Sequence, residues 1–313
     1  MPLAHADHKS ALQTIPLKTL RNGFVLPMLG LGTWMMGGDM VADPSADLVR
    51  EVDALQAGLA LGFRHIDTAE IYAGGVTEKV VATAINDFSR DDLILASKAF
   101  RTHHGYDDLL KALQGSLQRL GTDYLDLYYL HAPNLEIPLA ETARALNAAR
   151  RDGLIRHIAV SNFRPERLEE LQKHLESPIV ANQVHYNLVF REPEAVGMFE
   201  HAEKHDYFIV AWRPLQLQKR NVDPATTQKN IWEIGAYPAL DDIAAAAGKT
   251  NVQVALNWIA SHKHAVALIK SSNPAHLQEA IDACSWQLSE ADVENLSQNF
   301  QPQISISDTI PLQ

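Results

Sequence analysis

Four side chains able to hold or move a proton stand at or just beyond the ends of short apolar segments. Asp67 ends FRHID, Lys98 ends LILASK, His131 ends YLDLYYLH, and Tyr72 follows Asp67 by five residues. A buried unpaired charge is costly, so Asp67 and Lys98 are expected to pair. A phenol transfers protons near neutrality only if its pKa, ordinarily about 10, is lowered, as a nearby ammonium would do. The pattern therefore predicts an acidified Tyr72 beside Lys98, with His131 able to bond a carbonyl oxygen or relay the proton.

Simpler interpretations of the same residues stay open on spacing alone. Asp67 and Lys98 fit a structural ion pair equally well, since such pairs also perturb titrating groups. A single tyrosine in a loop, such as Tyr72, is usually a packing or surface aromatic. The chemical interpretation is favoured over these alternatives because the four residues lie at or just beyond the ends of three successive apolar segments.

The elements that must position these residues alternate regularly along the chain. Apolar segments predict strands at 28–33, 63–69, 93–99, 124–132, 156–162, 180–187, 208–214 and 265–272. Amphipathic segments predict helices at 48–61, 77–88, 106–120, 139–151, 165–175, 192–205 and 240–262. Strand and helix in alternation give a parallel sheet, and eight such units in about 250 residues predict an α/β fold of the (β/α)8 TIM-barrel type. A doubly wound open sheet is the weaker alternative, because no G-x-G-x-x-G follows the first strand.

The segment before the first strand has a different pattern. Asn22-Gly23 stands between two alternating apolar runs, which is typical of a β-hairpin. We expect this N-terminal hairpin to cap the floor of the barrel. No linker or charge run marks a boundary, so residues 1–313 are expected to form a single domain.

Composition and motifs argue against several classes of partner and of structural site. The chain has 46% hydrophobic residues and a formal net charge of -11, which argues against a nucleic-acid partner but not against one local basic pocket. No secretory signal and no apolar stretch of about 20 residues is visible, so we expect a cytoplasmic protein without a membrane partner. Cys284 is the only cysteine, which excludes an internal disulfide framework and a cysteine zinc cluster. His103-His104 and the 14 histidines suggest a metal, but no H-E-x-x-H set supports one, so no metal is expected.

Six motifs in order resemble the aldo/keto reductase superfamily over nearly the whole chain. They are LGLGTW at 29–34, the D-T-A segment with its tyrosine at 67–72, Ser97-Lys98, DYLDLYYLH at 123–131, the segment from Gly153 to Phe163, and N-Q-V-x-Y at 182–186. The resemblance implies a (β/α)8 barrel that binds an extended nicotinamide cofactor without a Rossmann domain. It also implies reduction of an aldehyde or ketone to an alcohol by hydride transfer.

The resemblance assigns roles to individual residues. Tyr72 would be the general acid, Lys98 and Asp67 would tune it, and His131 would orient the substrate carbonyl. Cofactor binding is assigned to Gly32, Thr33, Trp34, Asp67, Ser161, Asn162, Gln183, Trp212, Arg213, Pro214, Leu215, Lys270, Ser271, Ser272, Asn273, His276 and Glu279. The substrate pocket is expected to be lined by Trp34, Tyr72, Phe100 and His131, with Asn162, Trp212, loop 101–108 and tail 298–313 at its rim.

Several positions carry more than one interpretation. Ser161-Asn162 also fits a helix N-cap, and Trp34 fits packing at the barrel mouth equally well. Trp212 replaces the family's usual Tyr or Phe, and Ala132 replaces a common Trp, which would leave a roomier or more polar wall. Arg213 replaces a usual Ser; we expect it to contact the pyrophosphate, with a surface salt bridge as the alternative.

The cofactor and the activity each have a second candidate. The family's clamp for the adenosine 2′-phosphate has an Arg where this chain has His276, and Ala280 stands in place of its Asn. NADPH is preferred because Lys270 with its neighbours can still bind a phosphate, and NADH use stays open. The alternative to an enzyme is a cofactor-binding, non-catalytic regulatory member of the same fold. The substrate, the oligomeric state and the direction of reaction are not encoded in these motifs.

Overall fold

The computed structural model describes residues 15–217, 237–300, 306–307 and 310–313. The N-terminal segment in which no secretory signal was expected, and residues 301–305 and 308–309 of the expected pocket rim, lie outside this part. Within the described residues no helix combines the length and the apolar character needed to cross a bilayer.

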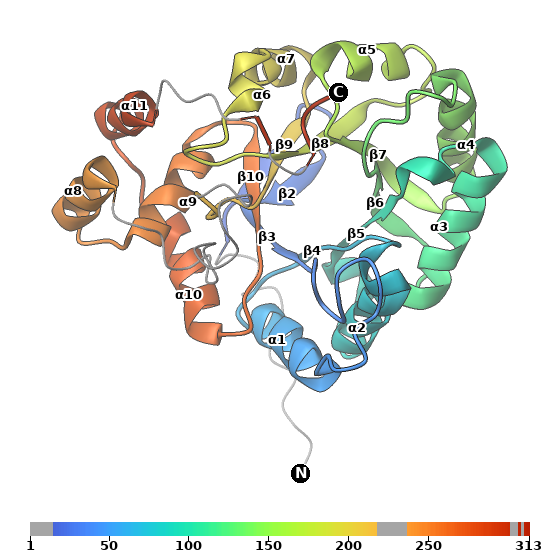
Figure 1. The fold of residues 1–313 in the computed structure, drawn as a ribbon, viewed down its shortest axis with the longest axis horizontal. Helices are drawn as coiled ribbons and strands as arrows, with labels where there is room; N and C mark the ends of the chain where they lie inside the picture. Colours follow the sequence, from blue (N-terminus) through green and yellow to red (C-terminus); the bar gives the residue numbers. More distant parts are fainter. Residues whose placement is uncertain (1–14, 218–236, 301–305, 308–309) are drawn as a thin grey trace.

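Eight parallel strands close into a barrel, as Figure 1 shows in a view into its mouth. The strands are β3 (Leu29–Gly32), β4 (His65–Asp67), β5 (Ile94–Ala99), β6 (Leu125–Leu130), β7 (Ile155–Ser161), β8 (Ile179–His185), β9 (Phe208–Trp212) and β10 (Ala265–Ile269). Each pairs with its sequence neighbour, and β10 returns to pair with β3. The predicted (β/α)8 fold is confirmed.

Helices surround the barrel in a ring (Figure 1). They are α1 (Leu48–Ala60), α2 (Val76–Ile85), α3 (Tyr106–Leu120), α4 (Leu139–Arg151), α5 (Pro165–Gln172), α6 (Glu192–Ala195), α7 (Met198–His205), α8 (Pro238–Ala247), α9 (Asn251–Ser261), α10 (Pro274–Asp282) and α11 (Glu290–Asn299). The predictions for α3 and α4 are confirmed to the residue. Apolar spacing fixes both ends there, and Gly121 ends α3 in the left-handed conformation.

Two helices predicted as continuous are each divided in two. The segment 192–205 breaks before Gly197, and the segment 240–262 breaks at Gly248, both glycines having left-handed backbone (φ +69° and +62°). After the second break, Thr250 and Gln253 form a reciprocal capping box that starts α9. The predictions were wrong at these points because a continuous apolar stripe does not reveal a left-handed glycine.

The N-terminal hairpin is present. Its strands β1 (Leu17–Thr19) and β2 (Val25–Pro27) pair antiparallel around a turn that contains Gly23 (φ +86°). Leu20 and Leu26 are buried among the inward-facing residues of the barrel. The ring of Phe24 lies 4.3 Å from that of His157, near the start of β7, so the hairpin covers the amino-terminal end of the barrel.

Truncation of the hairpin's buried leucine should destabilise the protein. We expect Leu26→Ala to lower the free energy of unfolding by about 2–5 kcal/mol, because the side chain is fully buried and leaves a cavity. Leu17→Ala in the same hairpin is the matched control, since Leu17 is 49% exposed, and should change it by less than about 0.5 kcal/mol. The shift of the guanidinium chloride midpoint measures both, and equal effects would contradict the capping role.

Candidate active site

A long cavity of about 980 Å³ opens at the carboxyl end of the barrel. Side chains at or just after the ends of β3, β4, β7, β8, β9 and β10 form most of its wall. Among the described residues, the wall includes every predicted cofactor residue except two, namely Gly32, Thr33, Trp34, Asp67, Ser161, Asn162, Gln183, Trp212, Arg213, Pro214, Lys270, Ser271, Ser272, Asn273 and His276. The predicted substrate residues Tyr72, Phe100 and His131 line it as well.

Lys98 lies at the centre of the hydrogen bonds at one end of the cavity. Its Nζ atom is fully buried and lies 2.6 Å from Asp67 Oδ2, 2.8 Å from the Thr68 carbonyl oxygen and 3.3 Å from Tyr72 Oη. Burial acts to lower the pKa of the ammonium, but the charge of Asp67 and the bonds to Asp67 and Tyr72 more than offset it, so that pKa is raised. The expected pairing of Asp67 with Lys98 is therefore present, with Tyr72 attached to it.

Backbone turns fix the position of Tyr72. It begins the short 3₁₀ helix η2 (Tyr72–Gly75), in which Ala73 has a left-handed backbone (φ +48°). This conformation is unfavourable for alanine and is held by a hydrogen bond from the Ala73 N–H to the Asp39 carbonyl oxygen. The ring of Tyr72 meets that of His131 edge-on, with centroids 5.5 Å apart.

The phenol of Tyr72 is not acidified. Burial raises its pKa above the ordinary value of 10.0, and the attraction of Lys98 does not cancel this effect. The prediction of a lowered pKa was wrong because it weighed the ammonium and omitted desolvation of the phenolate. Asp67 adds to the rise, since its negative charge offsets part of the field of Lys98.

His131 is held as a neutral imidazole. Burial, then the charge of Lys98, lowers its pKa well below 6.5. Its Nδ1 atom is buried and has no hydrogen-bond partner among the described residues. The backbone carbonyl oxygen of His131 accepts a bond of 3.1 Å from Asn162 Nδ2, which ties its strand end to the next.

Polar side chains from β7 and β8 form one wall of the cavity. Gln183 Nε2 donates to Asp67 Oδ1 (2.8 Å), and Ser161 Oγ donates to the Gln183 carbonyl oxygen (2.8 Å). Asn162 has a left-handed backbone (φ +63°), and its Nδ2 atom lies 2.9 Å from Ser161 Oγ. Trp212 Nε1 donates to Asn162 Oδ1 at 3.3 Å. Ser161 and Asn162 therefore bond along the wall, and no side-chain cap bond links them to α5.

Arg213 lies between two indole rings over the cavity. Its guanidinium carbon is 4.9 Å from the ring centroid of Trp34 and 5.1 Å from that of Trp212. Trp212 also stacks on His185, at 4.2 Å between centroids. Trp34 Nε1 donates to Asp39 Oδ1, and the Trp34 carbonyl oxygen accepts from Lys270 Nζ at 2.8 Å. Trp34 thus both lines the cavity and packs at the barrel mouth.

The other end of the cavity carries cations and hydroxyls. Burial lowers the pKa of Lys270, with Glu51 opposing the effect. Asn273 Oδ1 caps α10 by accepting from the Ala275 N–H, and Ser271 Oγ lies 3.3 Å from His276 Nδ1. Arg50 on α1 reaches this end, its Nη2 lying 3.5 Å from Ser272 Oγ. The sequence motifs gave no signal for Arg50, because its place depends on the course of the loop before α1.

Some predicted positions lie outside the wall that the described residues form. Leu215 is fully buried, and the Glu279 carboxylate accepts from Thr250 Oγ1 at 2.6 Å. Loop 101–108 contributes no residue to the wall, and Glu70 Oε1 accepts from the Phe100 N–H (2.6 Å) and lies 2.9 Å from His103 Nδ1. Among the described residues of the tail, Ile310 lines the wall.

The wall also contains residues that the sequence motifs did not predict, namely Met35, Met36, Asp39, Met40, Asp47, Arg50, Glu51, Ala54, Ile71, Gln216, Leu268 and Ile269.

A closed (β/α)8 barrel with a cavity at the carboxyl ends of its strands and a buried lysine, carboxylate and phenol beside it is typical of an enzyme that acts on a small molecule. Comparison with known proteins gives its family. The sequence profile of the Aldo/keto reductase family matches residues 28–299. An aldo-keto reductase of Mycobacterium sp. (strain JLS) is 33% identical over 283 residues, covering 90% of this chain and 92% of that protein.

Solved structures agree with this match. A thermostable aldo-keto reductase in complex with the inhibitor epalrestat has a TM-score of 0.83 at 40% identity, covering 91% of this chain and 100% of that chain. An aldo-keto reductase from Klebsiella pneumoniae in complex with NADPH has a TM-score of 0.80 at 31% identity, covering 96% and 100% respectively. The chain belongs to the aldo/keto reductase family and is an NAD(P)H-dependent carbonyl oxidoreductase.

Removal of one partner of the buried pair should destabilise the fold more than removal of both charges. We expect Lys98→Met to lower the free energy of unfolding by about 3–5 kcal/mol, because it leaves the Asp67 carboxylate buried without its cation. The double variant Asp67→Asn/Lys98→Met should recover part of that loss. Urea unfolding at pH 7.5 measures both, and a double variant no more stable than Lys98→Met would contradict the coupling.

Proposed function

We propose that this protein reduces an aldehyde or ketone with NADPH and that Tyr72 is the general acid. The observation that carries the proposal is the contact of Lys98 Nζ with both Asp67 and Tyr72 Oη at the cavity wall. The bound cofactor supplies the hydride, and the chain supplies the proton and the orientation.

The charges around Tyr72 suit proton donation. The raised pKa keeps the phenol protonated at neutral pH, which is the form that a general acid needs. As the proton passes to the carbonyl oxygen, the ammonium of Lys98 stabilises the phenolate that forms. Asp67 keeps Lys98 charged and in place, and neutral His131 can donate a hydrogen bond to the same carbonyl oxygen.

The cavity wall fits a nicotinamide dinucleotide. Near Tyr72, the amide and hydroxyl groups of Ser161, Asn162 and Gln183 would hold the carboxamide, and the indole of Trp212 would stack on the ring. Arg213, which lies over the rings of Trp34 and Trp212, would face the pyrophosphate. His131 Nδ1, which is buried without a hydrogen-bond partner among the described residues, supports a ligand at this wall.

The far end of the cavity favours the phosphorylated cofactor. Lys270, Ser271, Ser272 and the N-terminus of α10 surround it, and these groups suit a phosphate. Arg50 lies beside Ser272 and would supply a guanidinium at this end of the cavity, where His276 replaces the Arg of the family's clamp. The Klebsiella pneumoniae relative was solved with NADPH, which supports the same preference.

Tyr72→Phe tests the role of the general acid. We expect kcat/KM for NADPH-dependent aldehyde reduction to fall by about 10²- to 10⁴-fold, because the proton donor is lost. NADPH affinity, followed by fluorescence quenching, should stay within about threefold. The measurement is loss of nicotinamide absorbance with a panel of aldehydes and ketones.

Tyr106→Phe is the matched control, because Tyr106 lies outside the cavity wall, on α3, and contacts Arg144. It should reduce the panel at the wild-type rate. If Tyr72→Phe turned over as fast as this control, Tyr72 would not be the acid. If the wild type bound NADPH but reduced nothing in the panel, a non-catalytic role would be favoured.

Lys270→Met tests the cofactor preference. We expect the NADPH dissociation constant to rise about tenfold or more, the value of one lost charged hydrogen bond, while that of NADH changes by less than about threefold. Lys249→Met is the control, since Lys249 lies against Trp286 outside the cavity wall. Equal affinity of the wild type for the two cofactors would overturn the preference.

A further inference from the structure

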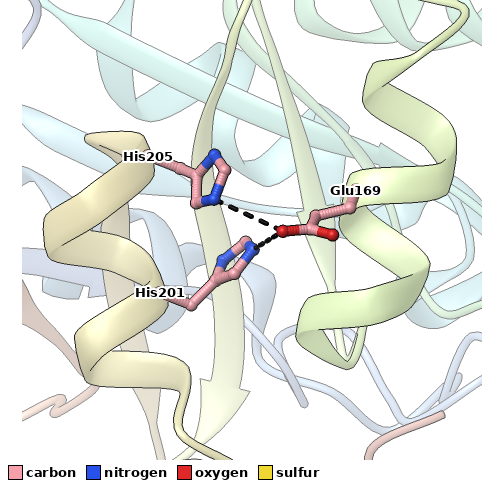
Figure 2. A group of neighbouring side chains, drawn as sticks. All are labelled: Glu169, His201 and His205. Carbon is pink, nitrogen blue, oxygen red and sulfur yellow. Dashed lines mark hydrogen bonds and ion pairs between the residues drawn. The ribbon is translucent and has the colours of Figure 1, made fainter.

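Two histidines on one helix face a glutamate on a neighbouring helix, on the outside of the barrel. His201 and His205 are one turn apart on α7, and Glu169 reaches toward them from α5, as Figure 2 shows. His201 Nε2 is 3.2 Å and His205 Nε2 is 3.4 Å from the same oxygen, Glu169 Oε1. One ligand atom from each residue lies within 4.8 Å of the others.

These distances suit a first-row transition metal ion. Bonds of 2.0–2.1 Å at a tetrahedral angle separate neighbouring ligand atoms by about 3.3–3.4 Å. The two N–O separations already lie near this value, and the i, i+4 spacing puts both imidazoles on one face of α7. The two imidazole rings stack, with centroids 4.2 Å apart and 24° between their planes, so an ion would enter between the three groups after rotation of His205 and of the exposed Glu169 carboxylate.

The other ring nitrogen of His201 has the partner that a metal ligand needs. His201 Nδ1 lies 3.0 Å from the Tyr207 hydroxyl, and that hydroxyl can donate to the Met198 carbonyl oxygen at 3.4 Å. If Tyr207 donates to Met198, its oxygen accepts the proton of His201 Nδ1, and the lone pair is then on Nε2, toward Glu169. Metal-bound histidines almost always donate their second N–H in this way.

The donor atoms of the cluster determine which kind of ion fits. Two imidazoles and one carboxylate suit Zn²⁺, Ni²⁺ or Cu²⁺, whereas Mg²⁺ and Ca²⁺ prefer oxygen ligands. Glu169 is 46% exposed, so water can complete the coordination.

We propose that Glu169, His201 and His205 form a divalent transition-metal site that joins α5 to α7. None of the three lies in the cavity wall, so the ion would stabilise the fold rather than take part in carbonyl reduction. The site is separate from the proposed function, and its test does not depend on catalysis.

Calorimetric titration of EDTA-treated protein with ZnCl₂ at pH 7.5 tests the site directly. We expect saturable binding of one Zn²⁺ that MgCl₂ does not reproduce, and a rise in melting temperature with Zn²⁺. His205→Ala and Glu169→Gln should each abolish that binding and the rise. Binding of Zn²⁺ by the wild type that these two variants leave unchanged would overturn the proposal.

Two further variants separate this site from general binding by surface histidines. His174→Ala is the matched control, because His174 is an exposed histidine just beyond the end of α5, and it should bind Zn²⁺ like the wild type. Tyr207→Phe should weaken binding about tenfold through the lost acceptor of His201 Nδ1. Circular dichroism melting without metal checks that each variant folds. Equal losses in His174→Ala and His205→Ala would show adventitious binding and overturn the site.

Discussion

The buried ion pair between Lys98 and Asp67 is the interaction on which the site depends. An ammonium without solvent is tolerated here because three oxygens surround it, from Asp67, Thr68 and Tyr72. Asp67 is in turn bonded by Gln183 from the opposite side of the barrel. The pair therefore links β4, β5 and β8 through side chains, and Lys98 contacts the hydroxyl of Tyr72, which is the proposed proton donor. The same contacts thus join three strands and position the proposed acid.

Two opposing effects act on the pKa of the Tyr72 hydroxyl, and the larger effect decides whether the hydroxyl is protonated. Desolvation of the buried phenolate raises the pKa of Tyr72 more than the ammonium 3.3 Å away lowers it, and the charge of Asp67 raises it further. An acidified phenol would be ionised part of the time and unable to donate. In the proposed reaction, this balance would leave Tyr72 protonated until a negative charge developing on a carbonyl oxygen drew the proton away. Lys98 would then stabilise the charge that forms, rather than the resting group.

The sequence predicted strands well and loop-dependent contacts poorly. Continuous apolar runs placed Asp67, Lys98 and His131 because strand ends meet at one face of a closed barrel. The division at Gly248 was readable in principle, since Thr250 and Gln253 have the spacing of a capping box. The contact of Arg50 with Ser272 depends on how the loop before α1 runs. The i, i+4 spacing of His201 and His205 is visible in the sequence, but their partner Glu169 lies on another helix.

The net charge of -11 does not describe the field inside the cavity. Charges more than about 8 Å apart in water are largely screened at physiological salt, so a bound phosphate responds to its immediate neighbours. The wall contains the cations Arg50, Arg213 and Lys270 together with the carboxylates Asp39, Asp47 and Glu51. In the proposed cofactor complex, Arg50, Lys270, Ser271 and the N-terminus of α10 would offset the nearby carboxylates and favour a phosphate at the far end. The groups next to the phosphate, rather than the net charge of the chain, would therefore decide whether it binds there.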